Sequence, residues 1–279
     1  MRCTLSMSVL ALALATGRPS IAQHRVDKLW ETDSVLAIPE SVLPQRECLY
    51  VSLIDGGAWA ADHKGGVARL DHHGKVLSDT WITGLDAPKG LARYGNLLYV
   101  ADLSNVVVID IPANRIDHKI PVPGAKGLND ITVANDGTVY VTDTQQSNVF
   151  KIQEEKPSLY ADSLKGVNGI KAVGKLVYIL TGDGMYVSDA PHKVRKLCDL
   201  EHGGDGIEPV GNGDFLVTSW GGWLYYVNAA GDKQLLLDTH ETNHKTADIG
   251  YDPETKTVYV PTFLGRSVAA YRLSADHGQ

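Results

Sequence analysis

One pattern repeats six times along this chain and constrains its fold more than any other feature. It is an apolar triplet that carries Tyr or Phe, and nearly every copy follows a turn signal such as YGN, NDG or NGD. A second β-like run follows each triplet, and a third follows in several copies. Short β-rich runs separated by Gly, Asn and Asp are typical of strands and hairpins. The six triplets are residues 49–51, 98–100, 139–141, 177–179, 215–217 and 258–260.

Each repeat predicts four short antiparallel strands over about 40 residues, which is the size of one blade of a β-propeller. No segment after the N-terminal region has a convincing helical period, so we expect an all-β fold. Six blades occupy residues 40–273, but the sixth lacks a fourth strand. Residues 27–35 resemble the outer strands of other blades. We therefore predict a closed six-bladed propeller in which this N-terminal segment completes the last blade and leaves no open edge.

The first 22 residues differ from the rest of the chain and predict a signal peptide. Arg2 precedes an apolar run, and the small residues before Gln23 resemble a cleavage site. The apolar run is too short to span a bilayer, and no later segment reaches the necessary length. We expect cleavage near Ala22 and Gln23, export to the periplasm or the medium, no membrane span, and one mature domain over residues 23–279.

The composition fits a globular protein that does not bind nucleic acid. Hydrophobic residues make up 43% of the chain and charged residues 21%, which argues against disorder. The formal net charge of −7 disfavours a partner whose phosphates require Lys and Arg. Cys48 and Cys198 follow the signal peptide, and two cysteines are too few for a disulfide framework. We expect two buried free thiols, with a disulfide between them as the alternative in an oxidising compartment.

A polar residue recurs nine or ten residues before each triplet, at the start of the expected innermost strand. Since the innermost strands of a propeller surround one channel, these residues should meet at one rim of it. Four of them, Glu40, Asn129, Asn168 and Asp205, offer two carboxylates and two amides, hard oxygen ligands that suit Ca²⁺ or Mg²⁺ better than a structural zinc site. The alternative for any single position is an ordinary turn or strand cap, as for the Asn-Gly pair at residues 168–169. The six residues are Glu40, Lys89, Asn129, Asn168, Asp205 and Asp248.

The repeats resemble the SMP-30/gluconolactonase family, also called the regucalcin-like family. The resemblance covers nearly the whole mature chain and is carried by the register PES…LYV, LND…DGTVYVTD, VNG…LVYI and GDG…GDFLVTSW. It implies a divalent cation at the channel mouth, with Glu40, Asn168 and Asp205 as direct ligands. It also implies that Asn129 is a ligand or a substrate contact, and that Asp130 supports its neighbour.

These features lead to three hypotheses about function. The first is an exported metal-dependent hydrolase of a lactone or similar small ester, in which Asp205 or a neighbouring acid takes the proton from the attacking water. The second is a non-catalytic propeller, similar to NHL and YWTD propellers, with a structural or vestigial metal site and a protein partner. The third is a phosphotriester hydrolase that uses the same ligands. The lactonase branch usually has Arg where this chain has Gly127. This difference concerns the identity of the small-molecule substrate more than the presence of the metal.

The roles of other polar residues near the expected rim stay open. Lys89 either contacts substrate or pairs with an acid, and Asp248 either orients a ligand or hydrogen bonds to the adjacent loop. His240 and His244 lie in the connection that enters the last repeat, and they fit either proton carriers or a solvated loop. Neither G-x-S-x-G nor H-E-x-x-H occurs, so serine hydrolase and zincin chemistry have no support in the sequence.

Overall fold

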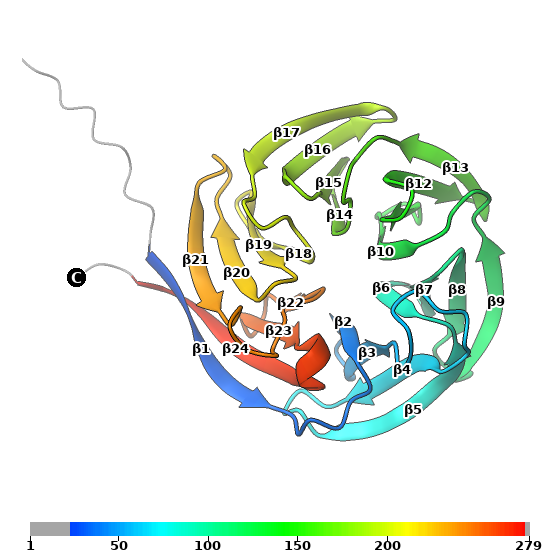
Figure 1. The fold of residues 1–279 in the computed structure, drawn as a ribbon, viewed down its shortest axis with the longest axis horizontal. Helices are drawn as coiled ribbons and strands as arrows, with labels where there is room; N and C mark the ends of the chain where they lie inside the picture. The colour runs from blue at the N-terminus through cyan, green and yellow to red at the C-terminus, as the bar shows by residue number, and fades with distance from the viewer. Residues whose placement is uncertain (1–22, 277–279) are drawn as a thin grey trace, which may run out of the picture.

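The computed structural model describes residues 23–276, and in this range the chain forms a ring of six four-stranded antiparallel sheets (Figure 1). Each sheet is one propeller blade, so the predicted all-β, six-bladed fold is confirmed. The predicted signal peptide, residues 1–22, lies outside the described residues. Within the described part, no helix is long and apolar enough to cross a membrane.

Five blades are built from consecutive strands, with the innermost strand first and the outermost strand last. Blades one to three contain β2 (Pro39–Pro44), β3 (Leu49–Leu53), β4 (Gly65–Leu70), β5 (Val76–Leu85), β6 (Pro88–Tyr94), β7 (Leu97–Asp102), β8 (Asn105–Asp110), β9 (Arg115–Pro121), β10 (Leu128–Val133), β11 (Val139–Asp143), β12 (Asn148–Gln153) and β13 (Lys156–Ala161). Blades four and five contain β14 (Ile170–Val173), β15 (Leu176–Leu180), β16 (Gly184–Ala190), β17 (Lys193–Asp199), β18 (Ile207–Gly211), β19 (Asp214–Ser219), β20 (Trp223–Val227) and β21 (Lys233–Asp238). Blade six contains β22 (Gly250–Asp252), β23 (Thr257–Pro261), β24 (Val268–Asp276) and, as its outermost strand, β1 (Gln23–Glu31). A short 3-10 turn, η1 (Phe263–Gly265), joins β23 to β24.

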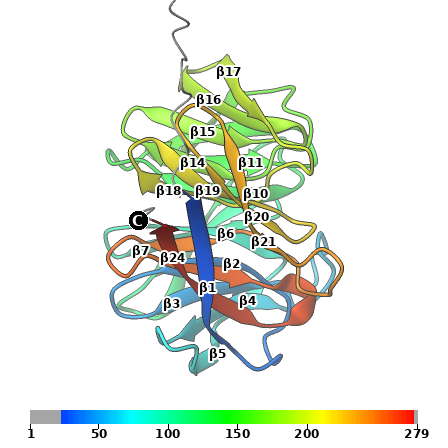
Figure 2. The ribbon, with the colours of Figure 1, turned by 90° about the vertical axis from the view of Figure 1, so that its left-hand side faces the viewer.

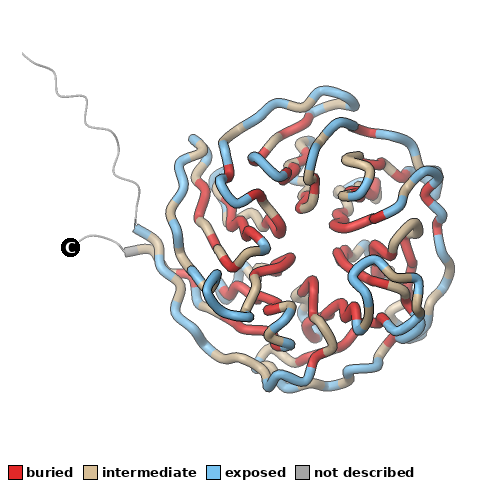
Figure 3. Tube along the Cα trace, viewed as in Figure 1, coloured by how far each residue is buried: buried red, intermediate tan, exposed pale blue. Residues whose placement is uncertain are grey.

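Six apolar clusters form the core, one between each pair of neighbouring blades. In β7, Leu98 and Val100 belong to the cluster shared with blade one, whereas Tyr99 and Ala101 belong to the cluster shared with blade three. This alternation is the period of two expected for a strand, and it explains why the repeated triplets are apolar throughout. Buried positions lie toward the channel and exposed positions on the outer strands (Figure 3). Each fully buried Leu or Val contributes about 1.5–3 kcal/mol to stability.

Antiparallel pairing between β1 and β24 closes the ring (Figure 2). The register places Gln23 opposite Asp276 and Glu31 opposite Ala269. The predicted closure by an N-terminal segment is therefore confirmed, although the strand begins and ends earlier than the predicted residues 27–35. The difference arises because the chain must leave the outer edge of blade six after Glu31 in order to reach the channel at β2.

β1 also fastens blade six to both of its neighbours. The backbone of His24 exchanges two hydrogen bonds with the side chain of Gln234 in β21, at 2.9 and 2.6 Å. The His24 ring stacks on Tyr226 of blade five, with centroids 3.7 Å apart. Near the other end of β1, Trp30 Nε1 donates to the backbone carbonyl of His72 in blade one at 3.0 Å. One strand thus holds three blades together.

Cys48 and Cys198 are free thiols, as expected. Cys48 is buried in the cluster between blades one and two, whereas Cys198 is half-buried in β17 of blade four. Burial raises the pKa of the Cys198 thiol, which disfavours its reactive thiolate form.

Removal of residues 23–31 should lower the melting temperature by about 10 °C, because Val26 and Trp30 lose their apolar contacts and β24 becomes an open edge. Thermal unfolding followed by circular dichroism would compare a chain that begins at Thr32 with one that begins at Gln23. Equal melting temperatures would show that the ring does not depend on β1.

Candidate functional site

All six residues of the predicted polar ring lie at the start of an innermost strand, as their spacing requires. Three of them are the second residues of β2, β6 and β10, namely Glu40, Lys89 and Asn129. The other three lie two residues before β14, β18 and β22, namely Asn168, Asp205 and Asp248. Asn168 is half-buried and the other five are buried. The topology therefore brings all six to one end of the channel.

Two glycines that follow ring residues allow neighbouring innermost strands to approach closely. A Cβ on Gly169 would lie 2.1 Å from the backbone oxygen of Asp205, and a Cβ on Gly206 would lie 2.5 Å from the backbone nitrogen of Ile249. Neither glycine has a positive φ, so the Asn-Gly pair at residues 168–169 is not a two-residue hairpin turn. The recurring Asn-Gly and Asp-Gly pairs follow instead from the convergence of strands at the channel.

A buried hydroxyl on the second strand holds the start of the innermost strand in blades one, three and five. In each case a backbone N–H donates to the hydroxyl oxygen, at 2.9, 2.9 and 2.8 Å respectively. The three bonds join Ser41 to Ser52, Asp130 to Thr142 and Gly206 to Thr218. Each donor directly follows a ring residue, so the backbone positions of Glu40, Asn129 and Asp205 are fixed by the same device.

These same three ring residues carry a buried side-chain oxygen without a hydrogen-bond partner. The atoms are Glu40 Oε2, Asn129 Oδ1 and Asp205 Oδ1. Within residues 23–276 no other buried side-chain oxygen is in this state, because the remaining unpaired atoms are nitrogens. Leaving such an acceptor unpaired costs about 1–3 kcal/mol. The ring thus presents three oxygen acceptors that a cation or a donor could satisfy.

Different partners orient the two amides. Asn129 Nδ2 donates to Thr144 Oγ1 at 2.9 Å, and Thr144 Oγ1 donates to the Val167 carbonyl at 2.6 Å. This arrangement commits the nitrogen of Asn129 and leaves its oxygen free to accept. Burial raises the pKa of the Asp205 carboxylate and the Asn168 side chain opposes this effect, which indicates that these two predicted ligands lie near each other.

Acidic groups crowd the ring, and burial raises their pKa values. Burial, reinforced by the nearby Asp248 carboxylate, raises the pKa of Asp205 to about 8 against the opposing charge of Lys89. Burial also raises the pKa of Asp248 to about 7. Burial raises the pKa of Glu40 well above its usual value, and the charges of Asp205 and Asp248 add to this effect. The three acids are close enough to repel one another, so the ring holds more acid than its own cation neutralises.

Lys89 supplies the positive charge of the ring. Burial lowers its pKa, while the carboxylates of Glu40 and Asp205 oppose this effect. The Lys89 ammonium lies 4.3 Å from the ring centroid of Trp59, which comes from the loop between β3 and β4 and is 39% exposed. Trp59 also lies against Gly127, where a Cβ would be 3.0 Å from its Cζ3. The sequence analysis missed Trp59, because its loop follows no repeated pattern.

Asp130 and Asp248 have structural partners. Asp248 Oδ2 accepts from Ser41 Oγ at 2.5 Å. Asp130 accepts from the backbone N–H groups of Ile131 at 2.8 Å and Ile170 at 2.9 Å. Asp130 therefore joins the innermost strands of blades three and four, and its predicted support of Asn129 stays a prediction.

The sequence analysis also missed an ion pair beside the ring. Lys171 Nζ lies 2.7 Å from Glu208 Oε1. Both residues line a cavity of about 10 Å³ next to Asp248, which is room for about one water. A signal for this pair was present, because Lys171 and Glu208 each lie three residues after a ring residue, Asn168 and Asp205 respectively.

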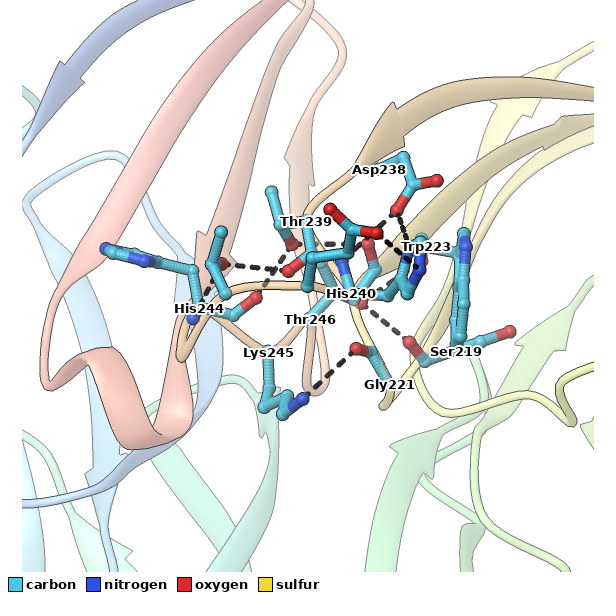
Figure 4. A network of polar contacts seen from close by, with 12 residues as sticks. Ser219, Gly221, Trp223, Asp238, Thr239, His240, His244, Lys245 and Thr246 are labelled. Carbon is cyan, nitrogen blue, oxygen red and sulfur yellow. Dashed lines mark hydrogen bonds and ion pairs between the residues drawn. The ribbon is translucent and has the colours of Figure 1, made fainter.

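The connection that enters blade six, residues 239–246, is hydrogen bonded to the hairpin between β19 and β20 (Figure 4). His240 Nδ1 lies 2.5 Å from Asp238 Oδ1, and His244 Nε2 lies 3.1 Å from Glu31 Oε1. Both histidines are thus engaged by acids outside the ring. This geometry favours a structural loop over a pair of proton carriers.

No group of three or more His, Cys, Asp and Glu side chains in the described range is arranged to hold a metal ion. The predicted ligand set contains only two carboxylates, Glu40 and Asp205, so it relies on the amide oxygens of Asn129 and Asn168. The assignment of these four residues to a cation therefore stays a prediction.

Solved structures of other proteins share this fold. A streptogramin B lyase has a TM-score of 0.62 at 12% identity, over 90% of this chain and 98% of the lyase. A gluconolactonase from Xanthomonas campestris has a TM-score of 0.59 at 14% identity, over 89% of this chain and 99% of the other. A protein of unknown function from Bacteroides thetaiotaomicron has a TM-score of 0.69 at 12% identity, over 91% of this chain and 77% of the other.

The predicted resemblance to the gluconolactonase family thus holds for the fold, and at these identities the likeness shows the fold alone. No protein-family model matches the sequence, and no curated protein matches it.

The stability of the metal-free protein should fall as the pH rises through 7 and 8. The folded state raises the pKa of Asp248 to about 7 and of Asp205 to about 8, whereas an unfolded Asp titrates near 3.9. The folded protein therefore holds protons that the unfolded chain has released, and this stabilisation is complete only below about pH 4.

Urea unfolding in EDTA at about pH 5.5 and about pH 8.5 would measure the effect. We expect a smaller free energy of unfolding at the higher pH, and a smaller difference in Asp205→Asn. A wild-type protein that gains stability over this range would contradict the burial of these acids.

Proposed function

We propose that the protein is a divalent-cation-dependent hydrolase that opens a lactone or similar small ester at the mouth of the propeller channel. One observation carries the proposal, namely the three buried and unpaired oxygens of Glu40, Asn129 and Asp205. Buried acceptors without a donor are rare in folded proteins. Three of them at corresponding positions of one ring are best explained by a ligand that they share.

The donor set fits Ca²⁺ or Mg²⁺. The carboxylates of Glu40 and Asp205 and the side-chain oxygens of Asn129 and Asn168 would hold the cation, and water would complete the shell. The two positive charges would also favour the ionised forms of Glu40 and Asp205, whose pKa values burial raises in the metal-free protein. The set contains neither Cys nor His, the usual ligands of structural zinc.

When bound, the cation supplies Lewis acidity that polarises a carbonyl oxygen and lowers the pKa of a water molecule. The chain itself provides the remaining groups. Asp205 has a buried unpaired oxygen and a backbone position fixed by the bond from Gly206 N–H to Thr218 Oγ1, so it suits the role of proton acceptor. Lys89 is held against the face of Trp59 and can stabilise negative charge that develops on the substrate.

The substrate class rests on the fold likeness to a gluconolactonase and on the mouth of the channel. The partly exposed indole of Trp59 offers a flat apolar surface beside the Lys89 charge, which suits a small cyclic ester. The likeness to a streptogramin B lyase makes a lyase reaction at this site the second candidate. We also propose that the protein acts after export, as the N-terminal 22 residues suggest.

Asp205→Asn should weaken Ca²⁺ binding by about ten- to a hundredfold, because it replaces a charged ligand with a neutral one. Asn129→Ala removes a neutral ligand and should weaken binding less. Calorimetric titration would measure both. Asp136→Asn, which alters an exposed carboxylate in the turn between β10 and β11, is the matched control and should bind like the wild type. Equal affinities of the wild type and Asp205→Asn for Ca²⁺ would contradict the proposed metal site.

Hydrolysis of glucono-δ-lactone, followed as acid release in a pH-stat, should stop after treatment with EDTA and return with Ca²⁺ or Mg²⁺. Asp205→Asn should lower kcat by about a hundredfold, because it removes the proton acceptor. Turnover of paraoxon instead of the lactone would favour the phosphotriester hypothesis. Metal binding without turnover of either ester would contradict the enzyme proposal and leave a non-catalytic binding propeller.

A further inference from the structure

A cavity lies at the seam between blades six and one, away from the ring. Its walls include the turn after β2, the turn between β4 and β5, and the hairpin between β22 and β23. The ring residues stand at the starts of β2 and β22, whereas these turns follow their ends. The cavity therefore opens at the opposite end of the innermost strands. Its volume of about 970 Å³ is in the range of small-molecule sites.

Aromatic side chains form a rigid apolar wall in this seam cavity. Trp30, Tyr251 and Tyr259 line it, and the centroids of Trp30 and Tyr259 are 5.9 Å apart. Tyr259 is only 2% exposed, so it forms the floor. The Trp30 indole is fixed by its hydrogen bond to the His72 carbonyl. The wall thus exists before any ligand arrives, which lowers the entropy cost of binding.

Two guanidinium groups line the cavity from opposite blades. Arg46 follows β2 in blade one, and Arg272 belongs to β24 in blade six. Neither side chain forms a hydrogen bond or an ion pair with another residue of the described range. Both are therefore available to a ligand, and guanidinium groups favour carboxylate and phosphate.

The two acids that line the cavity balance the formal charge of the two arginines, but they form no ion pair with them. Asp252 accepts from the backbone N–H of Glu254 at 2.9 Å and from Thr255 Oγ1 at 2.6 Å, so its carboxylate is used within its own turn. Glu254 is the remaining acid that lines the cavity. The two guanidinium groups thus have no ion-pair partner in the cavity and remain available to an anionic ligand.

We propose that the seam cavity is a second ligand site, and that it binds a small amphipathic organic anion. The planar apolar part of the ligand packs against Trp30, Tyr251 and Tyr259. Its acidic group pairs with the guanidinium groups of Arg46 and Arg272. The site is separate from the ring and does not depend on the proposed cation or on catalysis.

The position of the site gives binding a structural effect. Its walls come from the first and the last blade, which are the two that closure joins. A ligand that contacts both walls binds only the closed ring, so it must stabilise the closed ring by mass action. Binding should therefore raise the melting temperature as the ligand concentration increases.

The probe for the test is 8-anilinonaphthalene-1-sulfonate, an aromatic anion whose fluorescence rises in an apolar site. We expect saturable binding with one site per chain, and a melting temperature that rises with probe concentration. The neutral analogue N-phenyl-1-naphthylamine has the same aromatic body and should bind about tenfold more weakly, because it lacks the charge-assisted contacts.

Arg46→Gln and Arg272→Gln should each weaken sulfonate binding about tenfold and leave binding of the neutral analogue unchanged. Both residues are exposed, so neither variant should affect folding. Arg195→Gln alters an exposed arginine of β17 in blade four, outside the cavity, and is the matched control. It should bind like the wild type.

Three results would overturn the proposal. They are the absence of saturable binding to the wild type, equal binding by the arginine variants and the control, and equal affinity for the charged and the neutral probe. Asp205→Asn separates this site from the ring, because it should lose Ca²⁺ binding and keep probe binding. Failure of one site thus leaves the other standing.

Discussion

Backbone pairing between β1 and β24 is the interaction on which the rest of the molecule depends. Each of the six apolar clusters needs two blades, so a ring open at this seam would expose the faces of blades one and six. The cluster there contains Leu36, Val42, Tyr259 and Val268. Closure also forces the six innermost strands to converge, and only this convergence brings the polar ring together. The fold and the candidate site therefore both depend on closure of the ring.

The ring illustrates a conflict between stability and function. Three buried acids of the ring, Glu40, Asp205 and Asp248, have raised pKa values because burial disfavours their charged forms. A ring selected for stability alone would replace them with apolar side chains. The structure instead holds Glu40, Asn129 and Asp205 in place with buried hydroxyls one strand away and leaves an oxygen of each unpaired. A loss of stability that is confined to a few well-ordered polar residues is characteristic of binding sites.

The repeat made most of the fold predictable from the sequence. Six apolar triplets indicated the number of blades, and the spacing of nine or ten residues to Glu40, Asn168 and Asp205 placed the ring at one end of the channel. The repeat could not predict contacts made by irregular segments. Trp59 reaches Lys89 from a loop of blade one, and Trp30 meets His72 across the seam. Such pairs depend on how distant segments pack in space, and no periodicity in the sequence encodes them.

The closure seam also sets an order of events in folding. Gln23 pairs with Asp276, so this contact joins the two ends of the described chain. Folding slows as the sequence separation of native contacts grows, because loop entropy is lost before the contacts form. During synthesis β1 emerges before the other described strands and waits for β24, which emerges last. The last blade can therefore close only after β24, the last of the described strands, has been synthesised.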